Sequence, residues 1–200
     1  MSTYSLEVLA LNETATVTQL VALGDSLTEG YGIEKEKAYP ALVEKKLLDK
    51  GYKIKIFNAG ISGSTTASAP SRLKWLLKSK PNIIFIALGA NDGLRGIAIE
   101  TTKQNLKDAI QIAKKANIKV WLAGMKLPPN YGASYTSKFE ATFQEIAKEE
   151  DIPLLPFLLE GVAGHAELNQ PDGIHPNEKG HQKLADFLFS FFQQQLDRID

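Results

Sequence analysis

Short apolar runs alternate with segments of helical periodicity along the chain, and this alternation restricts the fold more than any other feature. Four runs are almost continuously apolar over the length of a strand, which is typical of strands buried on both faces, and a fifth is weaker. They are VTQLVAL (17–23), KIKIFNA (53–59), NIIFIAL (82–88), KVWLAGM (119–125) and the weaker IPLLPF (152–157).

The segments between these runs carry apolar residues at helical spacing. Leu106, Ala109, Ile110 and Ala113, for example, recur at intervals of three and four residues. Helices are predicted over 40–50, about 67–79, 100–116, 134–149 and about 178–196. Because the order is repeatedly strand then helix, right-handed crossovers predict an α/β fold with a parallel sheet between helix layers. A chain of 200 residues suits one core, so we expect a single domain over 1–200.

Composition excludes several classes of partner and chemistry. Lys plus Arg and Asp plus Glu both number 23, so no net charge attracts nucleic acid, and we expect none as a partner. The absence of cysteine excludes disulfides, thiolate metal sites and a thiol nucleophile. No apolar stretch is long enough for an integral membrane segment. The segment FLFSFF fits the buried face of a helix instead, as part of the pattern Leu184, Phe187, Leu188, Phe191 and Phe192.

Polar, glycine-containing segments follow the first three predicted strands, and another precedes the last helix. They read GDSLTEG, AGISGST, GANDGLRG and DGIHPNEKG. Since the carboxyl ends of parallel strands meet at one edge of a sheet, these segments are expected to converge there. This edge is where open α/β sheets bind ligands.

A serine hydroxyl at this edge becomes a nucleophile only when an imidazole accepts its proton and a third group orients that imidazole. Of the three histidines, only His175 has an acid at useful spacing, because Asp172 lies three residues before it in the turn DGIHP. Both segments also have ordinary interpretations: Ser26 as part of a helix start and DGIHP as a loop before a helix.

An oxyanion formed at the serine needs preorganised donors. The N–H of Ser26, the N–H of Gly63 in ISGST and the side-chain amide of Asn91 in GAND are candidates. A simple glycine turn and an asparagine cap are the alternatives for the last two.

Four blocks together resemble the motifs of the SGNH, or GDSL, hydrolase superfamily. GDS at 24–26, NAGISG at 58–63, GAND at 89–92 and DGIH at 172–175 occur in the order of that superfamily. Within it, the chain is most similar to the bacterial thioesterase I type, which combines arylesterase, acyl-CoA thioesterase and lysophospholipase activities. The resemblance extends from about Gln19 to Leu196, and it leaves 1–16 as an N-terminal extension of unknown role.

The resemblance implies Ser26 as nucleophile, His175 as general base and then acid, and Asp172 as the carboxylate that orients it. Ser26, Gly63 and Asn91 would form the oxyanion hole. The implied fold is a three-layer α/β/α sandwich around a five-stranded parallel sheet of flavodoxin-like order, 2-1-3-4-5. Substrate contacts are expected from six residues around these motifs: Asp25, Leu27, Leu94, Arg95, Pro129 and Ile174.

The implied activity is hydrolysis of carboxylic esters and thioesters through an acyl-enzyme, without metal or cofactor. Aryl esters, short- to medium-chain acyl esters, acyl-CoA and lysophospholipids are the expected small-molecule substrates. A periplasmic or secreted location follows from the resemblance if a leader has been removed, and a cytoplasmic one if Met1 is the native start. A monomer and a small homo-oligomer both remain open.

Four rival functions are weighed against this one. A carbohydrate O-acetyl esterase of the same superfamily would differ in chain-length preference. A nucleotide- or flavin-binding module lacks its GxGxxG or GxxxxGK[ST] segment, and an α/β-hydrolase lipase lacks its GxSxG elbow. A metal hydrolase would use His175, Glu178 and His181, but residues at this spacing fan across a helix face rather than converge.

Overall fold

The computed structural model describes residues 17–199, and the predicted extension 1–16 lies outside the described residues. Five strands form one parallel sheet with the order β2-β1-β3-β4-β5, which confirms the order implied by the resemblance. The strands are β1 (Thr18–Gly24), β2 (Ile54–Gly60), β3 (Ile83–Ala87), β4 (Lys119–Ala123) and β5 (Leu154–Leu155).

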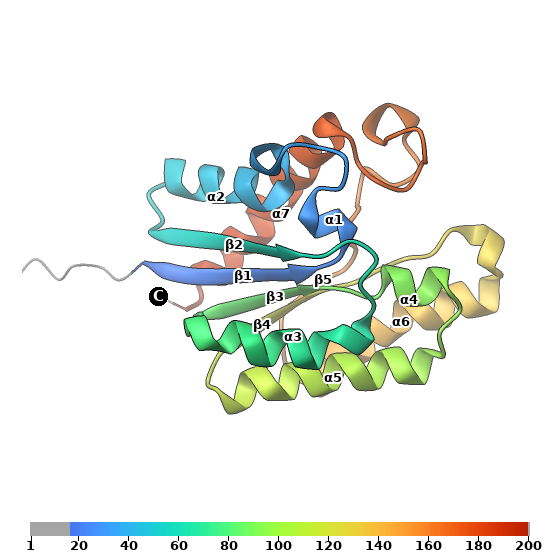
Figure 1. Ribbon diagram of the computed structural model, residues 1–200, viewed down its shortest axis with the longest axis horizontal. Coiled ribbons are helices and arrows are strands. Elements are labelled where there is room, and N and C mark those ends of the chain that lie inside the picture. Colours follow the sequence, from blue (N-terminus) through green and yellow to red (C-terminus); the bar gives the residue numbers. More distant parts are fainter. Residues whose placement is uncertain (1–16, 200) are drawn as a thin grey trace, which may run out of the picture.

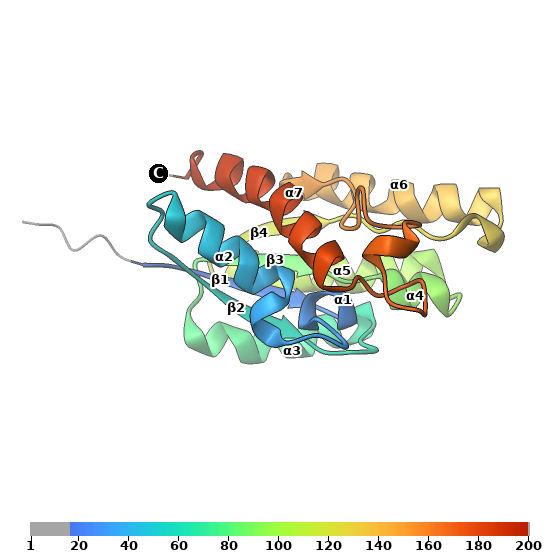
Figure 2. The same cartoon turned by 90° about the horizontal axis from the view of Figure 1, so that it is seen from above.

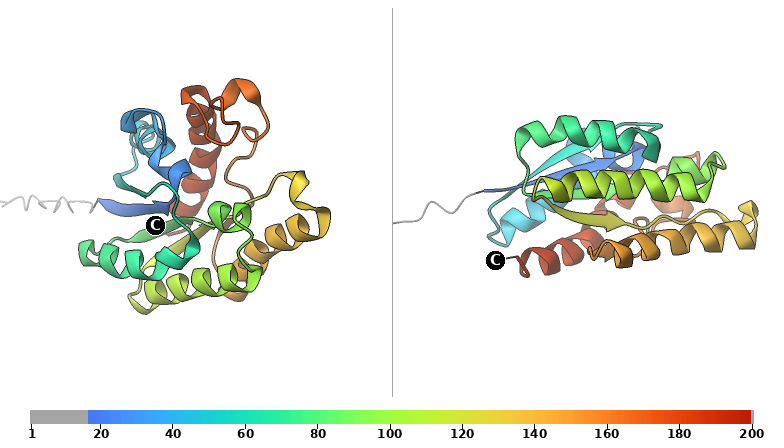
Figure 3. Two further views of the ribbon diagram at one scale, coloured as in Figure 1. Left: turned by 45° about the vertical axis from the view of Figure 1, so that its right-hand side comes forward. Right: turned by 90° about the horizontal axis from the view of Figure 1, so that it is seen from below.

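Two layers of helices cover the sheet, as Figures 1 and 2 show. The helices α2 (Tyr39–Asp49) and α7 (Glu178–Leu196) pack together on one face. On the other face lie α3 (Ala69–Leu76), α5 (Ile99–Lys115) and α6 (Ala133–Glu149), with α5 between the other two (Figure 3). The predicted α/β/α sandwich is therefore confirmed.

The apolar face predicted for the last helix packs into the core. Leu184, Leu188 and Phe192 are buried. The Phe192 ring makes edge contacts with Phe85 of β3 and Trp121 of β4, at centroid distances of 5.0 and 5.2 Å. Within residues 17–199, no helix combines the length and the apolar character that crossing a membrane requires.

The structure differs from the prediction in its shortest elements. The predicted fifth strand, 152–157, pairs only at Leu154–Leu155, because Pro153 and Pro156 on either side have no N–H to donate. Two short α-helices follow strands directly: α1 (Ser26–Glu29) and α4 (Ala90–Leu94). Five 3₁₀ turns complete the described chain: η1 (Lys35–Lys37), η2 (Thr66–Ser68), η3 (Leu77–Ser79), η4 (Pro129–Tyr131) and η5 (Ala166–Leu168).

Candidate active site

Ser26 lies at the carboxyl end of β1, which is a central strand between β2 and β3. It is the first residue of α1, and Asp25 is the N-cap whose carboxylate accepts the N–H of Leu27 at 3.0 Å. Asp25 is fully buried and Ser26 is 9% exposed. Burial raises the pKa of Asp25 from 3.8 to about 6 because the charged carboxylate loses its hydration there. The strand order thus places this hydroxyl where the sheet connections change direction, beside a buried acid.

The loop before α7 brings His175 to this hydroxyl from the other end of the chain. The Nε2 atom of His175 lies 2.9 Å from the Oγ of Ser26, and its Nδ1 lies 2.7 Å from Oδ2 of Asp172. The other carboxylate oxygen of Asp172 accepts the backbone N–H groups of Ile174 and His175, at 2.9 and 3.0 Å. The three residues that the sequence grouped are therefore in direct contact.

Hydrogen bonds keep Asp172 ionised. The backbone N–H of His175, the ring of His175 and the N–H of Ile174 together lower the pKa of Asp172 from 3.8 to about 2. A carboxylate facing Nδ1 fixes the proton of the neutral imidazole on that nitrogen. The free lone pair is then on Nε2, which can accept the hydrogen of the Ser26 hydroxyl.

The segments that carry Gly63 and Asn91 border the same strand end. The N–H of Ile61 donates to the carbonyl of Gly24 at 3.2 Å, which ties the loop after β2 to the end of β1. Gly63 itself has φ of +75°, a conformation that residues with a Cβ rarely adopt. The side-chain amide of Asn91, in α4, donates to the carbonyl of Ser64 at 3.1 Å and lies 3.4 Å from Oδ2 of Asp25.

A cavity of about 600 Å³ opens beside Ser26. Five of the six expected substrate contacts line it: Asp25, Leu27, Leu94, Pro129 and Ile174. The remaining walls are mostly apolar and include Leu127, Pro128, Phe157, Leu159 and Ala163. Arg95, the sixth, is not among the lining residues, and its guanidinium donates to the carbonyl of Gly63 at 3.0 Å.

The sequence pattern of the GDSL-like lipase/acylhydrolase family matches residues 22–183. The chain belongs to this family. It is 41% identical to esterase TesA of Pseudomonas aeruginosa over 90% of both chains. It is also 41% identical to thioesterase 1/protease 1/lysophospholipase L1 of Escherichia coli K12, over 87% of this chain and 83% of that one. The crystal structure of the psychrotrophic esterase EstA from Pseudoalteromonas sp., inhibited by monoethylphosphonate, is similar with a TM-score of 0.86 and 32% identity, covering 90% of this chain and 99% of EstA.

One buried acid that holds this GDSL-family site together had no role in the sequence interpretation. Asp92, 1% exposed in α4, accepts the N–H of Thr66 at 2.9 Å and also the hydroxyl of that threonine. The hydroxyl of Thr102 in α5 lies 3.4 Å from the same carboxylate. Asp92 thus fixes the end of the Gly63 loop against α4 and α5. The GAND block contained it, but only its asparagine had been given a role.

The residues of the rival metal site point to other partners. His181 is buried in α7, and its Nδ1 accepts the N–H of Tyr39 at 3.1 Å. Burial lowers the pKa of His181 from 6.5 to about 4, so this ring is neutral near neutral pH. Glu178 pairs with Lys37 at 2.8 Å. Across residues 17–199, no group of three or more His, Cys, Asp or Glu side chains is arranged to hold a metal ion.

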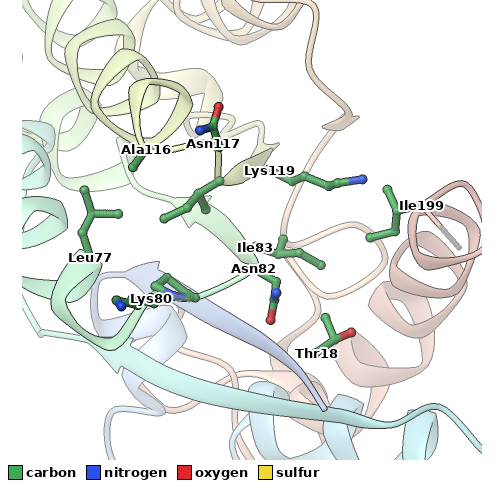
Figure 4. Close-up of a pocket in the computed structure, with 11 residues that line it drawn as sticks. Thr18, Leu77, Lys80, Asn82, Ile83, Ala116, Asn117, Lys119 and Ile199 are labelled. Atoms are coloured by element: carbon green, nitrogen blue, oxygen red, sulfur yellow. The ribbon is translucent and has the colours of Figure 1, made fainter. Parts of the chain in front are cut away.

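A second cavity, of about 590 Å³, lies at the opposite, amino-terminal end of the strands. Figure 4 shows Thr18, Ile83 and Lys119, from the starts of β1, β3 and β4, around it. Its walls contain two lysines and two asparagines but no serine, histidine or acid. Of these two cavities, only the one beside Ser26 has a serine, a histidine and an acid in its walls.

Proposed function

We propose that the protein is a serine esterase that hydrolyses carboxylic esters and thioesters through an acyl-enzyme. The observation that carries the proposal is the contact series from Asp172 to His175 to Ser26, with distances of 2.7 and 2.9 Å. The arrangement suits the reaction, since a carboxylate facing Nδ1 favours the tautomer in which Nε2 can act as a base. Membership of the GDSL-like family supports the same reaction class.

The reaction proceeds in two halves. Ser26 Oγ attacks the acyl carbon while Nε2 of His175 accepts the hydroxyl proton, and Asp172 stabilises the imidazolium that forms. The negative oxygen is stabilised by the N–H groups of Ser26 and Gly63 and by the amide of Asn91. The imidazolium then gives its proton to the departing alcohol or thiol. Water, activated by the same nitrogen, attacks the acyl-enzyme, releases the acid and returns the proton to Oγ.

The substrate class follows from the walls beside Ser26. Leu94, Leu127, Phe157 and Leu159 make an apolar surface that suits an acyl chain of short to medium length. Each methylene buried there contributes about 0.8 kcal/mol. A carbohydrate O-acetyl esterase is the less favoured alternative, since an acetyl group would leave most of this apolar surface unused. The relatives described above, an esterase and a thioesterase, support activity on both oxygen esters and thioesters.

A substrate panel with a nucleophile variant tests the proposal. Wild type and Ser26→Ala are compared on an aryl acetate, an aryl decanoate, palmitoyl-CoA, lysophosphatidylcholine and acetylated xylan. We expect Ser26→Ala to lose every activity and an organophosphonate to label only wild type. Ser71→Ala is the matched control, because Ser71 is an exposed residue of α3. Full activity of Ser26→Ala, or a preference for acetylated xylan over all acyl esters, would contradict the proposal.

We further propose that residues 1–200 act as one catalytic domain on small-molecule substrates. A periplasmic or secreted location is proposed on the family resemblance alone. Fractionation of cells that express the native gene tests it, and recovery of the enzyme only in the cytoplasm would exclude this location.

A further inference from the structure

A tyrosine that the mechanism does not use lies against the proposed base. The ring of Tyr31 is centred 4.7 Å from the imidazole of His175, and the two planes are inclined by 41°. Tyr31 is nevertheless 51% exposed. An aromatic side chain with half of its surface in solvent and the other part on a catalytic imidazole is placed to meet a substrate.

The backbone of Tyr31 is held from two sides. Its N–H donates to the carbonyl of Ser26 at 3.1 Å, and its carbonyl accepts from Nε2 of Gln170 at 2.6 Å. The next residue, Gly32, has φ of +78°, and a Cβ there would lie 2.4 Å from Oε1 of Gln170. Gln170 is therefore packed directly on this turn, and the exposed ring starts from a fixed backbone.

Gln170 also holds the loop that carries the base. Its N–H donates to the carbonyl of His175 at 2.7 Å, and its side-chain amide donates to the carbonyl of Pro176 at 3.1 Å. One residue thus ties the turn of Tyr31 to the loop of His175. The position of the Tyr31 ring relative to Nε2 is set by this connection as well as by the ring contact itself.

The direction of proton transfer decides which part of a substrate meets this ring. The leaving atom must lie within hydrogen-bond reach of Nε2 of His175, because that nitrogen gives it the proton. The acyl chain occupies the apolar cavity, whose walls do not include Tyr31. A leaving group held outside that cavity would lie beside the imidazole, which the Tyr31 ring contacts.

We infer that Tyr31 forms a wall of the leaving-group subsite and gives the enzyme a preference for planar aromatic leaving groups. This inference rests on the proposed esterase function, since it assigns the second half of the same substrate. Aromatic rings in contact prefer tilted or offset arrangements, and the inclined ring of Tyr31 offers both its face and its edge to a phenolic group.

Two esters with the same acyl group isolate the leaving-group side. We propose to measure kcat/KM, which reports acylation, for p-nitrophenyl butyrate and ethyl butyrate with wild type, Tyr31→Ala and Tyr31→Phe. Comparing each variant with wild type cancels the different intrinsic reactivities of the two esters. The aryl-to-alkyl ratio is expected to fall about threefold to tenfold in Tyr31→Ala, the magnitude of one lost aromatic contact, and to stay at the wild-type value in Tyr31→Phe.

A matched control and two readouts separate this role from others. Trp75→Ala removes an aromatic ring that is 67% exposed on α3 and does not line the cavity, so the ratio should not change. An aryl-to-alkyl ratio that stays at the wild-type value in Tyr31→Ala, whether both activities fall equally or neither falls, would overturn the inference and leave the esterase proposal intact. If wild type hydrolyses neither of the two esters, the proposed function itself is refuted. Melting curves of each variant confirm that the measured protein is folded.

Discussion

Replacing Asp172 by asparagine is the sharpest test of the proposed triad, because the change preserves shape and reverses one hydrogen bond. One carboxylate oxygen accepts the N–H groups of Ile174 and His175, and the other faces Nδ1 of His175 at 2.7 Å. In Asp172→Asn the amide oxygen stays with the two backbone donors. The NH₂ group must then face Nδ1.

A donor at that position forces Nδ1 to accept, so the imidazole proton moves to Nε2. Nε2 then cannot take the proton of Ser26, which lies 2.9 Å away. In serine protease triads the equivalent substitution lowers kcat about 10⁴-fold. A loss of this size corresponds to about 5 kcal/mol of transition-state stabilisation. We expect a similar loss here, because the two backbone N–H groups that donate to Asp172 fix which way the new amide turns.

The fold should survive, since the amide keeps the bonds that close the turn. The pKa of Asp172 is held at about 2, below its ordinary 3.8. Its ionised form therefore stabilises the native state above about pH 4, and this contribution is lost as the pH falls through about 2. Asp172→Asn lacks this contribution, so it should melt below wild type at pH 7 while still folding, and its stability should fall less steeply between pH 4 and 2.

The assay is kcat for p-nitrophenyl butyrate, with thermal melts at pH 7 and at acidic pH. Asp186→Asn is the matched control: Asp186 is an exposed α7 residue paired with Lys46, so this variant should keep wild-type kcat. A folded Asp172→Asn enzyme that retained more than about a tenth of wild-type kcat would refute the tautomer argument.

Three other substitutions probe the remaining parts of the site. Asn91→Ala should lower kcat about 10²- to 10³-fold by removing one oxyanion donor, and an unchanged kcat would exclude that role. Leu94→Ala should reduce kcat/KM for an aryl decanoate about tenfold more than for an aryl acetate, the equivalent of about two methylene contacts; equal losses would remove Leu94 from the acyl wall. Asp25 has a raised pKa of about 6, so its contribution to stability is present below about pH 3.8 and is lost as the pH rises through 6. Between pH 4 and 7 the melting temperature of Asp25→Asn should therefore fall less with rising pH than that of wild type. The same pH dependence in both proteins would show that burying the charge of Asp25 costs nothing.

The main strands and long helices were predictable because their signal is local. Four of the five predicted strands agree with the structure within about two residues at each end, since continuous apolar runs identify strands buried on both faces. A helix of four or five residues shows no periodicity, so α4 was not predicted, and α1 was foreseen only as the helix start that was the ordinary interpretation of Ser26. The fifth strand was overestimated, since its sequence is apolar but its two prolines restrict pairing.

The parts of the site that are formed by contacts between side chains could be predicted from the sequence. The spacing of Asp172 and His175 and the position of Ser26 after a strand identified groups that the structure brings into contact. Contacts made through backbone carbonyls leave no such pattern. Gln170, which donates to the carbonyl of Tyr31 at 2.6 Å, stands in the sequence as one more polar residue of a loop. Arg95 illustrates the converse, because its predicted partner was substrate and its observed partner is the Gly63 carbonyl.

The contact between Ser26 and His175, which are 149 positions apart, depends on two helices that the reaction never uses. Thr28, in the same short helix as Ser26, is hydrogen-bonded to the hydroxyl of Tyr39 at 2.8 Å. The N–H of Tyr39, at the start of α2, donates to Nδ1 of His181 in α7, the helix that follows the loop of His175. His181 can accept this hydrogen only on an unprotonated Nδ1, and burial, which lowers its pKa to about 4, keeps it neutral. Of the two histidines in this segment, His175 is the proposed base, whereas His181 must stay unprotonated on Nδ1 to keep its hydrogen bond to the start of α2.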